Sequence, residues 1–197
     1  LILIYVLFIF LEQASFKTKL NALLKRSSHS DKVAEIITTI GIKIKKYVAI
    51  KTFVSLLTAG ACYVVLILNN IDYASFWAFI IFLLNYIPTV GSMLAVLFPA
   101  LLSLVQFPTF TPFLIIISAL GVIQILVGNI LEPRLMSNSL NLSPLVVMLS
   151  LAIWGSIWGI AGMFLSVPFT VILMIVFSEF SKTKPIAIIL SQNGKIS

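Results

Sequence analysis

Charged side chains are rare in the apolar part of this sequence. From Thr52 to Ser181 the charged residues are Asp72, Glu132, Arg134 and Glu179. Glu132 and Arg134 stand close together in the segment EPRLMSNSLNLSP at 132–144, between two long apolar tracts. Such a segment is either a plain loop between two membrane helices or a polar element of a transport path. The segment alone leaves both interpretations open.

Other residues that commonly do chemistry are few and scattered. The 197 residues include one histidine, one cysteine and six carboxylates, which form no paired acid/base site and no metal-ligating cluster. His29 has no partner of metal-ligand type nearby, and Cys62 can form no internal disulfide. The sequence has no Walker A motif, so an ATP-driven pump would need a separate subunit. We therefore expect no enzyme activity, no cofactor and no metal.

The composition indicates a membrane protein. The chain is 60% hydrophobic and 10% charged, with a mean hydropathy of +1.16, far from the usage of soluble domains. Several continuous apolar stretches reach or approach the roughly 20 residues that a helix needs to cross a bilayer. The predicted fold class is all-α: a polytopic transmembrane helical bundle in a lipid bilayer.

Basic residues give the bundle a predicted orientation. The net charge is +7, and eight of the basic residues lie between Glu12 and Lys46, with further lysines in the tail. In a soluble protein this excess would suggest nucleic acid as a partner. Here both basic stretches flank apolar spans, so the positive-inside rule places them in the cytoplasm, and we expect no nucleic acid partner.

Four regions follow from these patterns. They are the end of a truncated span at 1–11, a basic amphipathic cytoplasmic segment at 12–46, a transmembrane bundle at 47–180 and a cytoplasmic tail at 181–197. The chain begins with Leu rather than Met, which we interpret as a fragment without its N-terminal part. Helical spacing of apolar residues within 12–46 predicts amphipathic helices that lie on the inner membrane surface or pack under the bundle.

Six apolar segments make up the predicted bundle. They lie at about 47–68, 75–87, 90–106, 113–131, 144–158 and 160–179. As one helix, the stretch 75–106 would be roughly 48 Å long, more than the hydrocarbon core of about 30 Å. NYIPTVG interrupts this stretch, and WGSIWGIAG is the natural break of 144–179. The bundle therefore has either six spans or two single spans and two re-entrant hairpins, and in both the chain is cytoplasmic after residue 131.

The six segments divide into two sets of three with similar punctuation. GSMLAVLFP at 91–99 echoes GMFLSVP at 162–168. An odd number of crossings per set would invert the second set relative to the first, which predicts the inverted 3+3 repeat found in many secondary transporters. Chance is the alternative, because membrane proteins are rich in Gly and Leu.

Local signals predict roles for the residues around these breaks. Pro133 should stop the preceding helix at the cytoplasmic face, and Ser143 and Pro144 fit the N-cap and first turn of the next helix. Glu132 and Arg134 either neutralise each other or are hydrated at the interface. Asp72 is expected to be solvated in an outer loop.

The order of these motifs resembles the AI-2E (autoinducer-2 exporter, PerM-type permease) family. NYIPTVGSMLAVLFPALLSL and NILEPRLMSNSLNLSPLVVMLSLAIWGSIWGIAGMFLSVPFTVIL carry the resemblance, which covers the chain from about Lys17 onward. It implies a multi-pass permease and a homo-oligomer in a bacterial inner membrane. Some members are linked to export of autoinducer-2 and others to Na⁺(Li⁺)/H⁺ antiport. Ser137 departs from the glycine expected after PRLM.

The resemblance and the polar positions together give the candidate site residues. Those for a transport path or gate are Asn85, Pro88, Gly91, Gln124, Asn129, Glu132, Pro133, Arg134, Pro144, Gly162 and Pro168. Gly155 and Gly159 form a GxxxG pair, the spacing that lets helix backbones approach closely, and are assigned to helix packing.

Three functions stay open at this point. The leading one is a secondary permease that exports a small solute, with an autoinducer-2-like signal as one candidate. A Na⁺(Li⁺)/H⁺ antiporter is the alternative. Such an antiporter needs a carboxylate within the membrane, whereas the carboxylates of the predicted bundle lie near helix ends. A non-transporting scaffold is the third, and it has no need of paired broken segments.

Overall fold

The computed structural model describes residues 30–136 and 141–194, and every element among them is helical. The elements are α2 (Ser30–Leu68), α3 (Ala74–Leu84), α4 (Val90–Gln106), α5 (Thr111–Gln124), the π-helix η1 (Ile125–Leu131), α6 (Glu132–Met136), α7 (Pro144–Glu179) and α8 (Lys184–Leu190). One isolated bridge joins Leu142 to Ser191. The all-α prediction is therefore confirmed. The predicted span at 1–11, His29 and Ser137 lie outside the described residues.

The described residues belong to two units, one ending at Ile42 and one beginning at Lys43. The described part of the first unit is the beginning of α2, which is helical from Ser30 onward and so covers the later part of the segment 12–46, where helices were expected. The second unit holds all the other elements, and the sites below lie within it.

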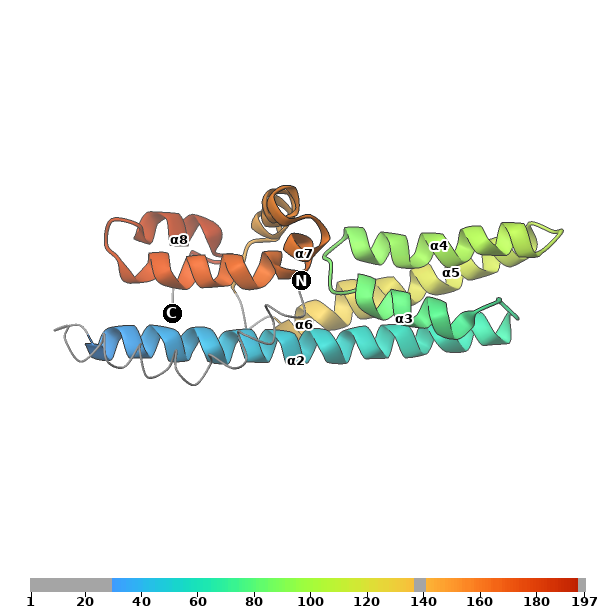
Figure 1. Cartoon of the computed structure of the whole chain (residues 1–197), viewed down its shortest axis with the longest axis horizontal. Helices are drawn as coiled ribbons and strands as arrows, with labels where there is room; N and C mark the ends of the chain where they lie inside the picture. Colours follow the sequence, from blue (N-terminus) through green and yellow to red (C-terminus); the bar gives the residue numbers. More distant parts are fainter. Residues whose placement is uncertain (1–29, 137–140, 195–197) are drawn as a thin grey trace, which may run out of the picture. The chain divides into compact units, whose positions relative to one another are not determined.

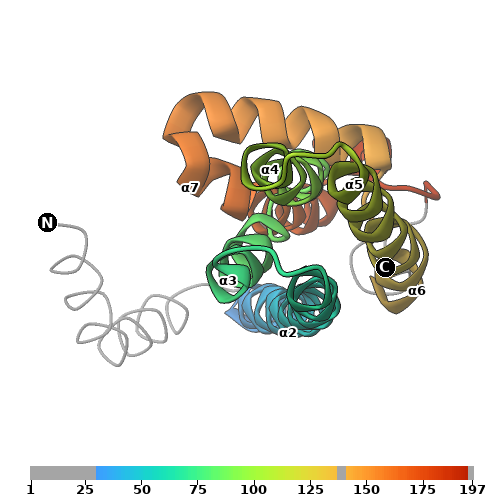
Figure 2. The same cartoon turned by 90° about the vertical axis from the view of Figure 1, so that its right-hand side faces the viewer.

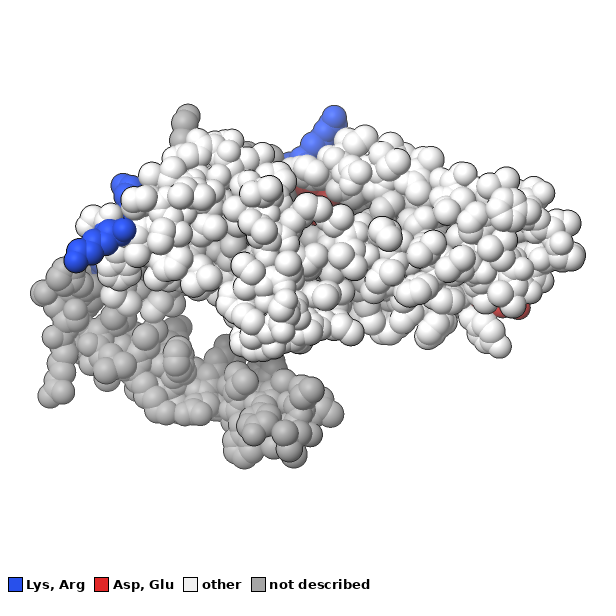
Figure 3. All heavy atoms as spheres, turned by 90° about the horizontal axis from the view of Figure 1, so that it is seen from above, with Lys and Arg blue, Asp and Glu red and all other residues white. Residues whose placement is uncertain are grey.

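Among the described residues, three helices are long and apolar enough to cross a membrane. They are Lys32–Leu68, Thr111–Met136 and Pro144–Glu179. On the face shown in Figure 3, nearly all of the described surface is uncharged. Large apolar side chains such as Leu56 and Leu68 lie on the surface, 65% and 75% exposed, which suits contact with lipid rather than water. These features support the predicted membrane protein.

The first hairpin consists of α3 and α4, which lie side by side (Figure 1). With 11 residues, α3 is about 16 Å long and too short to cross a core of about 30 Å. The backbone N–H of Val90 donates to the Pro88 carbonyl at 2.6 Å, and Thr89 has φ 60° and ψ −60°. This is a γ-turn of the rarer, strained kind. The break predicted at NYIPTVG is thus a tight reversal.

The second hairpin is α7, which reverses at Gly159 (φ 61°, ψ −140°). Figure 2 shows the helix turning back on itself. Trp154 in the first arm and Phe169 in the second have ring centroids 4.9 Å apart, so the two arms run antiparallel. The break predicted within WGSIWGIAG is confirmed. The arms cover 144–158 and 160–179, as the sequence suggested.

Glycines just after each reversal allow the hairpin arms to pack closely. A Cβ on Gly91 would collide with the backbone carbonyl oxygen of Leu84, and one on Gly162 with that of Trp154. The two halves of the sequence therefore share a long helix, a short arm, a reversal and a close-packed glycine. That one half is inverted relative to the other stays a prediction.

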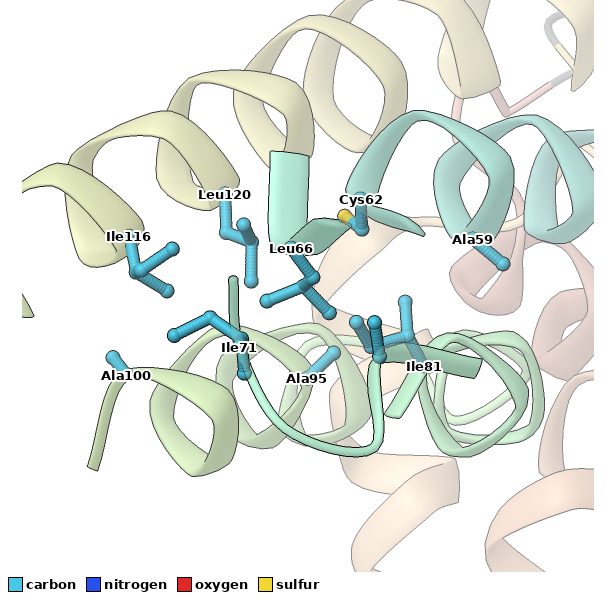
Figure 4. Packing of buried hydrophobic residues seen from close by; sticks show 10 residues of the cluster. Ala59, Cys62, Leu66, Ile71, Ile81, Ala95, Ala100, Ile116 and Leu120 are labelled. Atoms are coloured by element: carbon cyan, nitrogen blue, oxygen red, sulfur yellow. The ribbon is translucent and has the colours of Figure 1, made fainter. Parts of the chain in front are cut away.

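The apolar core of the second unit lies between α2, the first hairpin and α5. Figure 4 shows Cys62 and Leu66 of α2 together with Ile81 of α3 and Leu120 of α5. Small residues of α4 such as Ala95 complete this core and let the helices approach closely. The core holds together α2, α3 and α5, and the polar residues of the site come from the middle of α2 and from the C-terminal ends of α3 and α5.

Candidate functional site

A buried ion pair joins α2 to the end of the long helix 111–136. Lys51 Nζ donates to Glu132 Oε1 at 2.5 Å, and the side chains are 4% and 18% exposed. The two residues are 81 positions apart in the chain. A lysine withdrawn from solvent needs such a partner, because an unpaired charge in a low-dielectric interior is costly.

Glu132 lies in a helix that Pro133 does not stop. The prediction that it would was wrong: helix α6 contains Pro133 and extends to Met136. The π-helix η1 precedes it, and the N–H of Glu132 donates five residues back to the Val127 carbonyl. The wider π turn accommodates a proline that lacks an N–H and would crowd a regular α-helical turn.

A second group of polar contacts joins α2, the end of α3 and α5. Asn85, at the end of α3, is 3% exposed and donates to Ser55 Oγ at 3.0 Å. Gln124 Nε2 donates to the Oδ1 of Asn85 at 3.3 Å. The side-chain amide of Asn85 therefore bridges α2 and α5. Ser55, Asn85 and Gln124 each have a hydrogen-bond partner within the protein.

The tip of the first hairpin contacts the second arm of α7 beside these polar groups. Tyr86, next to Asn85, shares a 2.7 Å hydrogen bond with the hydroxyl of Thr52 on α2. Its ring stacks on Phe164 of α7, with centroids 5.8 Å apart and planes at 19°. The first hairpin is thus in direct contact with the second.

Two cavities border the ion pair. The α5 cavity, about 640 Å³, is lined mainly by residues of α4, α5 and η1. The α7 cavity, about 690 Å³, is lined mainly by residues from the end of the long helix and the first arm of α7. Both are lined by Lys51, Pro88, Thr89, Gly128 and Glu132.

Most of the sequence-derived candidates line these cavities. Those in the α5 cavity are Asn85, Pro88, Gln124, Asn129 and Glu132. Those in the α7 cavity are Pro88, Glu132, Pro133, Arg134 and Pro144. Ser143 is the N-cap residue of α7 and Pro144 opens the helix, as expected. Asp72 is exposed between α2 and α3.

The remaining candidates lie in the hairpins, and one differs from its assigned role. Gly155 packs against Met163 in the opposite arm of α7, whereas Gly159 forms the reversal and has open space around its Cα. Gly162 makes the close backbone approach instead. Pro168 lies inside the second arm of α7, half-buried. The two glycines of the GxxxG pair therefore have different roles: Gly155 makes a packing contact and Gly159 forms the turn.

Sequence reasoning missed Lys51. It is the only charged residue in the apolar segment 47–68, and that isolation was the available signal. An ionisable residue within a membrane segment is expected to have a partner facing the bundle interior. The partner itself could not be read from the sequence, because nothing local links the two positions.

Known proteins that resemble this chain identify its family. The chain matches the family model "AI-2E family transporter" over residues 1–182. The chain belongs to the AI-2E transporter family. The family is one of transport proteins rather than enzymes, which agrees with the expectation from the scattered carboxylates.

Two relatives match nearly the whole chain. A protein of Borreliella burgdorferi with a provisional name as a transport protein is 36% identical over 200 residues, which cover 100% of this chain and 55% of that protein. The AI-2 transport protein TqsA of Escherichia coli is 35% identical over 195 residues, 99% of this chain and 56% of that protein. The chain thus spans about half the length of these AI-2E relatives.

Proposed function

We propose that this chain forms the solute path of a secondary permease that exports a small solute across a bacterial inner membrane. The observation that carries the proposal is the α5 cavity, which lies beside the reversed first hairpin and is lined by the Lys51–Glu132 ion pair and by three side-chain amides. Irregular backbone and charged groups at membrane depth are tolerated where they line a cavity, and transporters use such places for substrate.

The cavity chemistry suits a small polar solute without strong net charge. Glu132 and Lys51 neutralise each other, and Asn85, Gln124 and Asn129 offer amide donors and acceptors. Because one relative is named as an AI-2 transport protein, an autoinducer-2-like signal is the first solute to test. The proposed assembly is a homo-oligomer, with 47–180 as its transmembrane bundle and the basic segment 12–46 and the tail in the cytoplasm.

Solute uptake into everted vesicles tests this proposal. The full-length protein should carry autoinducer-2 into the vesicles, and Glu132→Gln should lower the rate by about tenfold or more, because it leaves the buried lysine unpaired. Asp72→Asn is the matched control, since it removes an exposed carboxylate and should keep the normal rate. Normal uptake by Glu132→Gln at normal protein level would remove Glu132 from the path.

Na⁺(Li⁺)/H⁺ antiport is the second candidate, and one observation favours it. Glu132 is a partly buried carboxylate whose partner is a buried lysine, and an exchanger of H⁺ for Na⁺ needs a carboxylate within the membrane. Everted vesicles with a pH gradient and a proton-sensitive dye distinguish the two. Prompt collapse of the gradient on adding Na⁺ or Li⁺, absent without the protein, would favour antiport.

A further inference from the structure

We propose that Lys51, Glu132 and the tip of the α3–α4 hairpin form the closed barrier between two halves of one path. The observation that motivates this is that both cavities are lined by the same five residues, which include the ion pair and the turn residues Pro88 and Thr89. The inference rests on the proposed transport function, and its test needs no substrate.

The two cavities follow one another along the long helix 111–136. The α5 cavity is lined by residues of this helix from Ile117 to Glu132, and the α7 cavity by residues from Gly128 to Met136. From Ile117 to Met136 an α-helix would span roughly 28 Å, close to the thickness of a hydrocarbon core. Together the cavities therefore extend over about one membrane thickness, and the ion pair lies where they overlap.

Contacts between several elements lie where the two cavities overlap. Lys51 reaches from α2 to Glu132, so the ion pair bridges two helices that both line the cavities. Pro88 and Thr89 add the tip of the first hairpin to the same place. Opening a continuous path here requires the ion pair to separate or the tip to move.

The hairpin tip has features that suit such a movement. Thr89 has φ 60°, a conformation that a β-branched residue rarely adopts. The tip is also joined to the second hairpin through the stacked rings of Tyr86 and Phe164. A shift of either hairpin is therefore transmitted to the residues that border the ion pair.

A purely structural ion pair makes a different prediction. It would neutralise a buried lysine and stabilise the bundle, but its loss would leave the access of water-soluble reagents to each cavity unchanged. The barrier, in contrast, controls which side of the membrane each cavity can be reached from. Accessibility therefore separates the two roles, whatever the transported solute is.

Cysteine labelling of the full-length protein measures this access. The native Cys62 is first replaced by alanine. Ser92→Cys then reports on the α5 cavity and Met136→Cys on the α7 cavity, because each of these residues lines one of the two cavities only. Everted vesicles receive a membrane-impermeant maleimide, which reaches the face that the lysines assign to the cytoplasm.

With the ion pair intact, Met136→Cys should react and Ser92→Cys should be protected. Right-side-out vesicles should give the reverse pattern. Adding Glu132→Gln should raise labelling of Ser92→Cys from the cytoplasmic face by about tenfold or more, since breaking a buried pair removes at least that factor from the closed state. Asp72→Asn and Lys46→Gln, which remove exposed charges, should leave the protection unchanged.

Two further variants keep the test decisive. The double variant Lys51→Glu/Glu132→Lys exchanges the two charges and should restore protection of Ser92→Cys. Glu132→Asp keeps the charge but shortens the side chain. It should raise the labelling of Ser92→Cys above that of the Asp72→Asn control, but less than Glu132→Gln does. This variant provides the measurement if Glu132→Gln does not reach the membrane.

The outcomes separate the barrier from the proposed function. Equal labelling of Ser92→Cys from both faces, or unchanged protection in Glu132→Gln and Glu132→Asp, would overturn the barrier even if the protein transports solute. Increased labelling in a protein that moves no autoinducer-2 and no cation would support the barrier and would refute the proposed solute instead.

Discussion

Close packing at the two hairpins predicts an unusual response to a very small change, glycine to alanine. In an ordinary helix interior this change stabilises a protein by about 0.8–1 kcal/mol. At Gly91 the added Cβ would lie closer than 3.0 Å to the backbone carbonyl oxygen of Leu84, and at Gly162 it would meet that of Trp154 in the same way. A carbonyl oxygen of a helix backbone cannot rotate aside as a side chain can.

The size of the effect follows from what must move. To admit the Cβ, the two arms of the hairpin would have to separate, which loses contacts along their whole length. Overpacking of this kind costs about 1–3 kcal/mol or more, and the helix-propensity gain of about 1 kcal/mol offsets only part of it. We expect Gly91→Ala and Gly162→Ala each to lower the melting temperature, by about 2–4 °C for each kcal/mol of net destabilisation.

Thermal unfolding of the full-length protein in detergent measures this, with Gly60→Ala as the matched control. Gly60 is also helical and has nothing within 4 Å of its would-be Cβ, so this variant should melt at or above the parent. The reasoning about close approach would be refuted if all three variants behaved alike. If Gly91→Ala were destabilising and Gly162→Ala were not, the structural echo between the halves would lose its support.

Other positions give sharper tests of single features. Gly159→Ala should cost about 1–3 kcal/mol, because φ 61° with ψ −140° is open mainly to glycine, and melting in detergent would show it. Thr89→Gly should melt at or above the parent by relieving a positive φ, whereas Thr38→Gly in regular helix should melt below it, at a cost of roughly a few tenths of a kcal/mol. The reverse order would contradict the γ-turn. Asn85→Leu should lower stability by about 1–3 kcal/mol, since it leaves the buried Ser55 and the partly buried Gln124 without this partner. An unchanged melting temperature would argue against that network. Cys62, 2% exposed, should react with a maleimide only after unfolding, as a labelling time course would show.

The architecture could be predicted from the sequence because lipid imposes simple limits on length. The stretches 75–106 and 144–179 are too long for one span, and proline and glycine showed where each would break. The structure has reversals at both places, at Thr89 and at Gly159. The short arm α3 then favours a hairpin over two full spans, a choice that the sequence had left open.

The site was harder to predict because its decisive contacts are not local. The pairing of Lys51 with Glu132 depends on how α2 packs against the long helix, and sequence spacing carries no information about it. The prediction that Pro133 ends the helix failed for a different reason. A proline rule assumes regular α-helical bonding, whereas the π-helix before it changes the hydrogen-bond partners by one residue.

The irregular backbone and the buried charge occur together because each needs the same surroundings. A γ-turn at Thr89 and a π-helix ending at Leu131 both disturb regular helical bonding, which lipid cannot compensate. A lysine at position 51 likewise cannot face acyl chains. Space within the protein that offers polar partners accommodates all three, and they gather around the same two cavities. In this chain the broken helices therefore lie where the isolated charge of α2 finds its partner.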